Sequence, residues 1–422
     1  MSRIHRIVAR EVLDSRGNPT VEAEVHVHGG AWGRAIVPSG ASTGAAEAHE
    51  LRDGDAARYE GRGVRRAVAH VMETIAPALV GCDPVDQQAV DRQLLALDDT
   101  PQKTRLGANA LLAVSLAAAH AAAVVRRVPL YRHLNDLFRE IDPAAPTPRM
   151  PVPMINMISG GLHAGGNLDF QDFLILPMGA DGLAAGLEWS VRIYRQLGRL
   201  LAESGFEGRL VGDEGGYGPR LTSNAQAAEF VVRAIEAADL QPGRDVTLAI
   251  DVASTHFFDG QRYRLAATGE ARLTSEQMIE QLAELVERFP ITSIEDGLAE
   301  DDWPGWQQLT ARLGSRVKLV GDDLFATSAL RLERGIDLGA ANSVLIKVNQ
   351  IGTLSETLET IRLARAHGYA YVVSARSGET EDCTIADLAV ATAADSIKIG
   401  SIVRGERLAK YNQLLRIAEE LV

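Results

Sequence analysis

The sequence predicts an α/β protein whose C-terminal part forms a (β/α) barrel. Short apolar runs recur after the first third of the chain, and most of them end in a charged residue. Amphipathic stretches of helical period separate most of these runs, which is the rhythm of parallel β/α units. The first predicted strand is not followed by a Gly-x-Gly-x-x-Gly pattern. Its absence favours a barrel over an open dinucleotide-binding sheet.

The N-terminal segment predicts strands followed by helices. Residues 4–15 and 20–28 alternate in polarity and are joined by the turn-forming residues 16–19, a pattern typical of a β-hairpin. Residues 63–128 predict helices. The Pro- and Ala-rich segment 137–153 predicts a linker.

Two domains are therefore expected, an N-terminal α+β domain over residues 1–138 and the barrel over residues 139–422. The N-terminal domain contains the segment 38–44 (PSGASTG), which consists of small residues with no hydrophobic anchor. A loop of this composition can move and can bring backbone N–H groups close to an anion. An ordinary surface turn is the alternative interpretation.

The apolar stretch 108–125 is long enough to suggest a membrane span. It is rich in alanine and includes Asn109, Ser115 and His120, so a buried helix of a soluble protein is the preferred interpretation. The first residues contain no uninterrupted apolar run of the kind that signal peptides have. We expect no membrane partner.

The charge and the cysteines predict a cytoplasmic protein that does not bind nucleic acid. The chain has a formal net charge of −13 and no long basic run, so a nucleic acid or an anionic membrane is a poor partner. Cys82 and Cys383 form no Cys-x-x-Cys pair, as expected for a reduced, cytoplasmic protein.

Seven ionisable side chains mark the ends of the predicted barrel strands. The seven residues are Glu214, Asp251, Glu295, Asp322, Lys347, Arg376 and Lys398. One acidic residue at a strand end is often only a helix cap. Seven at equivalent places would converge on the C-terminal rim of a barrel, where the chemistry of this fold takes place.

The acidic members of this set predict a magnesium site. Asp251, Glu295 and Asp322 would repel one another without a cation among them, and they offer only oxygen ligands. Oxygen ligands suit Mg²⁺ better than Zn²⁺. The alternative is a structural network of ion pairs with the three basic residues of the set.

Lys347 lies in an otherwise apolar strand and is a candidate general base. A divalent cation and other basic groups nearby would lower the pKa of this lysine. A metal, such a lysine and an opposing carboxylic acid together suit the removal of a proton next to a carboxylate.

Six longer motifs resemble the enolase family over almost the whole chain. They are PSGASTG (38–44), GDEGG (212–216), SIEDGL (293–298), GDDLF (321–325), LIKVNQIG (345–352) and RSGETED (376–382). The resemblance implies a modified (β/α)8 barrel capped by the N-terminal α+β domain, and a homodimer or larger homo-oligomer. Enolases are themselves a known example of a Lys or His base acting with one or two Mg²⁺ ions.

The resemblance also implies a role for each site residue. Lys347 would be the base and Glu214 its acid partner. The expected metal ligands are Asp251, Glu295 and Asp322 for one Mg²⁺, with Ser42 joining a second Mg²⁺ that arrives with the substrate. The expected substrate contacts are Arg376 and Ser377 to the phosphate, Lys398 to the carboxylate, and His163 and Gln171 along the pocket.

Three positions depart from the usual enolase motifs. Ala375 stands where a histidine usually precedes the phosphate-binding arginine, Asp172 replaces a glutamate, and Ile399 replaces a threonine. Losing an imidazole removes a proton-transfer group and opens space beside Arg376. We expect Ile399 to remodel the anion site next to Lys398.

These departures leave three functional interpretations. The preferred one is a paralogue that eliminates water from a modified or larger 2-phosphoglycerate-like substrate to give an enolpyruvate product. It would resemble the carboxyphosphonoenolpyruvate synthases of natural-product biosynthesis, the enolase relatives of phosphinate-antibiotic pathways. The second is an ordinary enolase that converts 2-phosphoglycerate to phosphoenolpyruvate in glycolysis. The third is a non-catalytic binding protein. In the first two, the partner is a small phospho-carboxylate.

Overall fold

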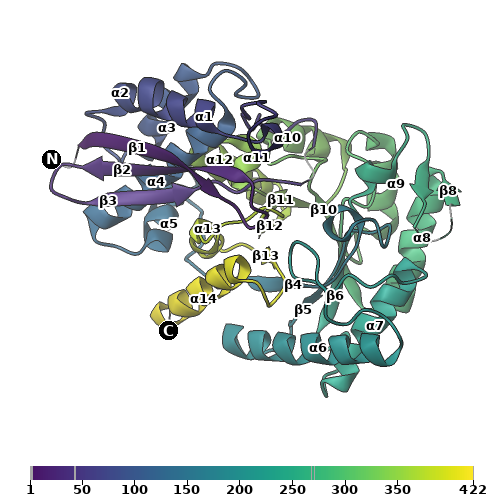
Figure 1. Cartoon of the computed structure of the whole chain (residues 1–422). Coiled ribbons are helices and arrows are strands. Elements are labelled where there is room, and N and C mark those ends of the chain that lie inside the picture. Colours follow the sequence, from purple (N-terminus) through teal and green to yellow (C-terminus); the bar gives the residue numbers. More distant parts are fainter. Residues whose placement is uncertain (1–2, 42–43, 268, 270, 422) are drawn as a thin grey trace.

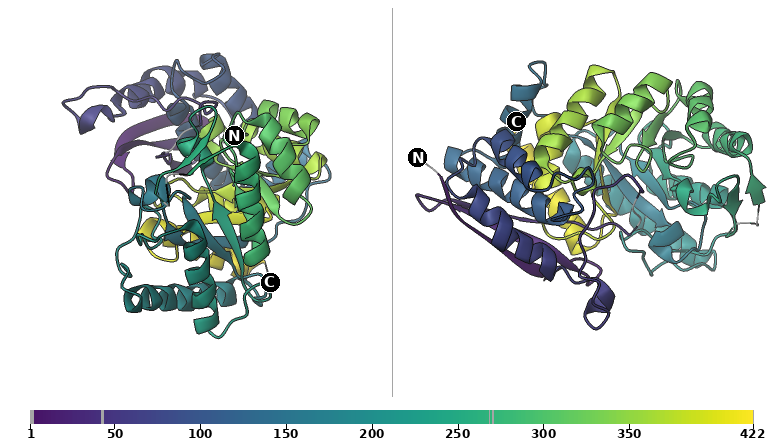
Figure 2. Two further views of the ribbon diagram at one scale, coloured as in Figure 1. Left: turned by 90° about the vertical axis from the view of Figure 1, so that its right-hand side faces the viewer. Right: turned by 90° about the horizontal axis from the view of Figure 1, so that it is seen from above.

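The computed structural model describes residues 3–41, 44–267, 269 and 271–421. A small sheet covered by helices comes first along the chain and lies beside a closed barrel surrounded by helices (Figures 1 and 2). Helices α3, α4 and α5 of the first part contact α11, α12 and α13 of the barrel.

The N-terminal sheet has three antiparallel strands in the order β1-β2-β3. The strands are β1 (Ile4–Leu13), β2 (Pro19–Val27) and β3 (Trp32–Ile36). The predicted hairpin is confirmed, whereas β3 was not predicted. A carboxylate closes the hairpin turn, since Asp14 Oδ1 accepts hydrogen bonds from the backbone N–H groups of Arg16 and Asn18.

The region predicted to be helical does form helices. They are α1 (Arg65–His70), η2 (Val71–Ile75), α2 (Ala76–Leu79), α3 (Gln87–Leu97) and α4 (Ala108–Arg126). Two further helices lie outside the predicted region, η1 (Tyr59–Gly61) and α5 (Leu130–Ile141), and α5 extends into the predicted linker. By length and composition α4 could cross a membrane, but 83% of its apolar window is buried inside the protein. It packs on β2 and β3, where a Cβ atom on Gly33 would lie 2.4 Å from the Ala117 carbonyl oxygen. The small residues of α4 therefore permit close packing in a domain core.

Eight strands form a closed barrel in the order β10-β11-β12-β13-β4-β5-β6-β9. They are β4 (Val152–Ser159), β5 (Asp172–Leu176), β6 (Thr247–Asp251), β9 (Ile291–Glu295), β10 (Lys318–Gly321), β11 (Ser343–Ile346), β12 (Ala370–Ser374) and β13 (Ser396–Gly400). The modified (β/α)8 barrel is thus confirmed. The modification is β5, which runs antiparallel to both of its neighbours. The connection from β4 to β5 contains only the short helix η3 (Gly161–Ala164) and not the α-helix that usually carries the crossover between parallel strands.

One predicted strand is wrong. Residues 210–214 form a loop, in which Val211 bridges Tyr217 and Gly212 donates a backbone hydrogen bond to Gly216. The run is short and is followed at once by two glycines, so the chain turns back before a ladder can form. The predicted parallel pattern also missed β4 and β5.

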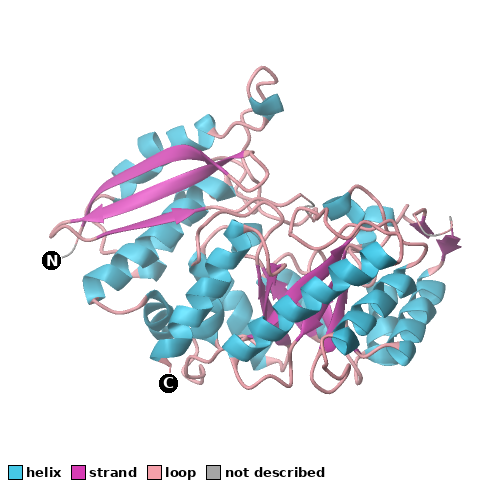
Figure 3. Ribbon diagram, turned by 60° about the horizontal axis from the view of Figure 1, so that its bottom comes forward, coloured by secondary structure: helices cyan, strands magenta, loops and turns pink. Residues whose placement is uncertain are grey.

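Helices surround the barrel and connect its strands (Figure 3). They are η3 (Gly161–Ala164), α6 (Leu183–Glu203), α7 (Asn224–Ala237), η4 (Ser254–Phe257), α8 (Ser275–Arg288), α9 (Trp303–Leu313), α10 (Ala329–Leu338), α11 (Val348–Ile351), α12 (Leu354–Ala366), α13 (Thr384–Thr392) and α14 (Gly405–Glu420). A Ser or Thr side chain caps the start of α7, α8, α10 and α12. The short strands β7 (Tyr263–Leu265) and β8 (Ala271–Leu273) form a separate hairpin.

An apolar plug fills the barrel interior below the rim. We use this name for the cluster Met154, Leu174, Leu176, Ala249, Val320, Leu345 and Val372. Alternate residues of a strand share a face, so the plug residue Val320 and the rim residue Asp322 lie on one side of the chain. The same spacing relates Leu345 to Lys347.

Candidate active site

The ends of β6 and β9 bring two carboxylates together around one lysine. Asp251 ends β6 and Glu295 ends β9, and the two residues are register partners. Lys398 on β13 donates hydrogen bonds from Nζ to Asp251 Oδ2 at 2.6 Å and to Glu295 Oε2 at 2.8 Å. All three side chains are buried. Burial and the nearby Asp251 carboxylate raise the pKa of Glu295 well above its usual value. This excess of negative charge in a buried site fits a bound cation.

Asp322 lies directly after β10 and forms the second part of the acidic rim. Its carboxylate accepts hydrogen bonds from Lys347 Nζ and, at 2.8 Å, from Gln350 Nε2. Asp296 holds the chain around it, because its two carboxylate oxygens accept the backbone N–H groups of Asp322 and Asp323. Asp296, Asp322 and Asp323 have carboxylate oxygens within 4.8 Å of one another. Neither Asp296 nor Asp323 was predicted as part of the site.

Lys347 follows β11 and points into the same space. Burial lowers the pKa of Lys347, but the carboxylates of Asp322 and Glu295 together raise it above its usual value. The lowered pKa that we predicted is that of a lysine beside a divalent cation, and it stays a prediction. The Asp322 carboxylate by itself stabilises the ammonium form.

A histidine and two carboxylates face Lys347 from the other side of the barrel mouth. His163, Asp172 and Glu214 have ligand atoms within 4.8 Å of one another, and all three are buried. His163 Nδ1 lies 2.9 Å from Asp172 Oδ2, and Asp172 also accepts a hydrogen bond from Asn156. Burial would lower the pKa of His163, but Asp172 and Glu214 raise it to about 9. The imidazole is therefore protonated and oriented at neutral pH.

The antiparallel strand β5 explains why Asp172 reaches this rim. Because β5 runs opposite to its neighbours, its first residue lies at the C-terminal rim, where Asp172 is the register partner of Asp251. The preceding Gln171 donates from Nε2 to Asp251 Oδ2 at 3.2 Å. Gln171 Oε1 is buried and has no hydrogen-bond partner among the described residues. This oxygen is free to accept a hydrogen bond from a ligand.

The residues predicted to hold a phosphate lie after β12. Arg376 is held by Glu47 of the N-terminal domain through hydrogen bonds of 2.9 and 3.1 Å, and by Asn349 Oδ1 at 2.9 Å. Ser377 Oγ accepts the backbone N–H of Ala41 at 2.7 Å, so the predicted mobile loop contacts the same place. Ser42, the predicted contact of the second Mg²⁺, lies outside the described residues.

Glu47, Asn349 and Gln350 were missed by sequence reasoning. Asn349 and Gln350 lie inside the quoted motif 345–352, two and three residues after Lys347, so the signal was present but unused. Glu47 follows the loop 38–44 and gave no comparable signal. It became visible only when the fold placed the N-terminal domain against the barrel rim.

A small space, which we call the catalytic cavity, unites most of the predicted residues. It is lined by Gly40, Ala41, His163, Gln171, Glu214, Asp251, Lys347, Ser374, Ala375, Arg376, Ser377 and Lys398. Ala375 thus borders the space in which a substrate would lie. Ile399 does not. Its side chain is fully buried in the main hydrophobic core on the other face of β13, so the expectation that it remodels the anion site is wrong.

Two protein-family models match this chain. A model of the enolase N-terminal domain matches residues 4–134. A model of the enolase C-terminal TIM barrel domain matches residues 147–422. The matches follow one another and include both the N-terminal region that supplies Glu47 and the barrel that supplies the charged rim.

Proposed function

The chain belongs to the enolase family, and we propose that it is a Mg²⁺-dependent lyase that removes an α-proton and then water from a 2-phosphoglycerate-like substrate. The observation that carries this proposal is the catalytic cavity itself. Lys347 on one side and His163 with Glu214 on the other line a single space with two further cations. Asp172 contacts His163 from outside that lining. This arrangement suits an anionic substrate that must lose a proton from one face and a hydroxyl from the other.

Asp251, Glu295 and Asp322 would hold the Mg²⁺ ion. Enolase-family proteins typically bind this metal, and the raised pKa of Glu295 and the partnerless Gln171 Oε1 fit a site built for a cation and an oxygen-rich ligand. When bound, Mg²⁺ would stabilise the negative charge that develops on the substrate carboxylate. A second ion would arrive with the substrate, and we assign its protein contact to Ser42.

The side chains of the cavity would carry out proton transfer and substrate binding. Bound Mg²⁺ would favour the neutral form of Lys347, whose Nζ takes the α-proton, and the electron pair of the broken C–H bond moves into the substrate carboxylate to give an enolate. That electron pair then forms the carbon–carbon double bond as the C–O bond to the hydroxyl breaks. Glu214 and the His163 imidazolium supply the proton with which that hydroxyl leaves as water. Asp172 orients His163 through Nδ1. Arg376 and Ser377 bind the phosphate, and Lys398 binds the carboxylate.

The presence of alanine at position 375 favours a substrate other than plain 2-phosphoglycerate. Ala375 borders the catalytic cavity beside Arg376, where the family motif usually supplies an imidazole. We therefore infer a paralogue that accepts a modified or larger phosphate or phosphonate, similar to carboxyphosphonoenolpyruvate synthase in natural-product biosynthesis. We further propose that the active form is a homodimer or larger homo-oligomer.

Steady-state kinetics with 2-phosphoglycerate and Mg²⁺ test the substrate assignment. We expect weak turnover by the wild type and an increase of roughly 10²- to 10⁴-fold in Ala375→His, the range for one proton-transfer group. Efficient dehydration by the wild type would overturn the paralogue assignment and identify an ordinary glycolytic enolase. Absence of turnover in both proteins, with any phospho-carboxylate, would favour a non-catalytic role.

A further inference from the structure

The carboxylate of Glu47 holds the arginine that we assign to the substrate phosphate, although Glu47 belongs to the N-terminal domain. Arg376 donates a pair of hydrogen bonds to it, from Nη1 to Glu47 Oε2 at 2.9 Å and from Nη2 to Glu47 Oε1 at 3.1 Å. Both side chains are buried. A paired arrangement of this kind fixes the plane of a guanidinium as well as its position. The proposed reaction assigns no substrate or metal contact to Glu47.

Glu47 is itself held from several sides. Its Oε1 atom accepts the backbone N–H of Gly44 at 3.1 Å and Gln350 Nε2 at 3.3 Å. The amide of Gln350 is fixed in turn, because it donates to Asp322 Oδ1 at 2.8 Å and accepts from Thr327 Oγ1 at 2.6 Å. Gln350 and Thr327 are fully buried. The orientation of the Glu47 carboxylate is therefore determined by the protein itself.

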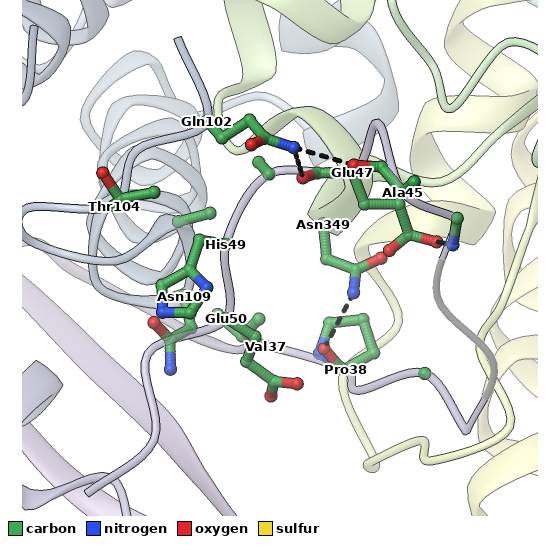
Figure 4. Close-up of a pocket in the computed structure, with 14 residues that line it drawn as sticks. Val37, Pro38, Ala45, Glu47, His49, Glu50, Gln102, Thr104, Asn109 and Asn349 are labelled. Carbon is green, nitrogen blue, oxygen red and sulfur yellow. Dashed lines mark hydrogen bonds between the residues drawn. The ribbon is translucent and has the colours of Figure 1, made fainter. Parts of the chain in front are cut away.

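Asn349 lies beside Glu47 and also holds Arg376 (Figure 4). Its Oδ1 atom accepts Arg376 Nη1 at 2.9 Å, and its Nδ2 atom donates to the Pro38 carbonyl oxygen at 3.3 Å. Glu47 and Asn349 line a cavity of about 390 Å³ on the side of the N-terminal domain. Close packing does not fix the two side chains on that side, so their hydrogen bonds determine where Arg376 lies.

The charge of Glu47 and its position have opposite effects on a bound phosphate. Burial would lower the pKa of Arg376, but the Glu47 carboxylate raises it above its usual value, so the guanidinium stays charged. The same negative charge repels a phosphate that approaches Arg376. If charge alone mattered, the site would bind phosphate more tightly without Glu47. A carboxylate at this place is therefore explained by geometry.

We propose that Glu47 is a positioning residue of the reaction, which aims the Arg376 guanidinium at the substrate phosphate. This inference rests on the proposed function, since it takes the phosphate to bind at Arg376. It makes the N-terminal domain a part of the phosphate site, although the groups that contact the phosphate belong to the barrel.

Calorimetric titration in Mg²⁺ buffer tests the proposal with two probes, inorganic phosphate and D-glycerate. The first has the phosphate of 2-phosphoglycerate without its carbon chain, and the second has the chain and the carboxylate without the phosphate. Glu47→Gln should weaken inorganic phosphate about tenfold and leave D-glycerate unchanged. The reason is that the amide nitrogen, which replaces one carboxylate oxygen, cannot accept an N–H group of Arg376. An effect of charge alone would tighten phosphate binding instead.

Glu47→Asp separates position from charge in a second way. It keeps the negative charge but withdraws the carboxylate by one methylene group, so the affinity for inorganic phosphate should fall by about threefold to tenfold. The matched control is Glu50→Gln, which removes the same charge from a nearby carboxylate that pairs with Arg52 at 2.7 Å. We expect the control to change neither titration.

A double-mutant cycle tests whether Glu47 acts through Arg376. Arg376→Ala should weaken inorganic phosphate, and adding Glu47→Gln to it should cause no further loss. Additive losses, or equal losses for both probes, would indicate a merely structural role and overturn the proposal, as would unchanged or tighter phosphate binding in the Glu47 variants. In those cases the loss in Arg376→Ala leaves the proposed function standing. If Arg376→Ala itself leaves phosphate binding unchanged, the phosphate is not bound at this place, and the proposed function fails as well.

Discussion

The two levels of the barrel interior are built from the same strands with opposite chemistry. The plug is apolar and buried, whereas the rim two residues further along the strands is polar and mostly charged. Val320 and Asp322 illustrate the step, as do Leu345 and Lys347. On the antiparallel strand β5 the order is reversed, and Asp172 precedes Leu174.

This difference separates the source of stability from the source of activity. Burying apolar side chains stabilises the fold, whereas burying the carboxylate of Glu295 beside Asp251 raises the pKa of Glu295 and costs stability. The plug allows the strands to tolerate that cost. Changes at the rim should therefore affect turnover most, and changes in the plug should affect unfolding most.

Removal of the metal should have the largest effect at the rim. We expect EDTA to abolish turnover and added Mg²⁺ to restore it, because Asp251, Glu295 and Asp322 carry more negative charge than the rim lysines neutralise once an anionic substrate binds. The measurement is product formation followed by ultraviolet absorbance in chelated and reconstituted enzyme. Full activity in EDTA would contradict the metal site.

Loss of the base should come next. Lys347→Ala should lower kcat roughly 10²- to 10⁴-fold and should abolish exchange of the substrate α-proton with heavy water, measured by NMR. Glu214→Gln should lose elimination but keep exchange, because it acts on the opposite side of the cavity. Exchange that persists in Lys347→Ala would show that another residue takes the proton.

A plug variant should show the reverse pattern. Leu174 is almost fully buried in the plug, and Leu174→Ala should lower the free energy of unfolding by about 2–5 kcal/mol. The kcat of the folded enzyme should stay within about twofold of the wild type, since removing Cγ and both Cδ atoms of a plug leucine leaves the catalytic groups in place. Urea unfolding and kinetics on the same samples give both values.

The control for the plug variant is the same substitution on the surface. Leu330 is 77% exposed, and Leu330→Ala should change the free energy of unfolding by no more than about 0.5 kcal/mol. A fall in kcat of more than about twofold in the folded Leu174→Ala enzyme would show that the plug also determines activity.

Strand periodicity made much of this organisation predictable. Runs ending in Asp251, Glu295, Asp322 and Lys347 placed most of the charged rim on the correct strand ends. The same alternation could have excluded Ile399 from the cavity, because it adjoins Lys398 on one strand. The polarity pattern did not predict that β5 is a barrel strand and that residues 210–214 are not. It also gave no information on the antiparallel direction of β5, because strand direction depends on the connecting loops and on barrel closure.

Contacts between distant segments were the least predictable. Glu47 and Arg376 are 329 residues apart in the sequence, and their ion pair exists only because the N-terminal domain packs on the rim. The direction in which the pKa of Lys347 shifts is a related case. Its sign depends on whether a cation or only Asp322 is the closest charge, and sequence spacing does not determine that.

The smallest predicted effect is a pH-dependent change in the free energy of unfolding, caused by His163. Burial would lower the pKa of this imidazole, but Asp172 and Glu214 raise it to about 9 in the folded protein. A histidine with a raised pKa stabilises the fold below the pKa of the unfolded chain, near 6.5, and this contribution is lost as the pH rises through about 9. Between pH 6.5 and 9.5, the wild type should therefore lose roughly 1–3 kcal/mol more than His163→Asn, as measured by urea unfolding. The exposed His28 serves as the control, and His28→Asn should follow the wild type. An NMR titration midpoint near 6.5 for His163 would contradict the charge arrangement on this side of the rim.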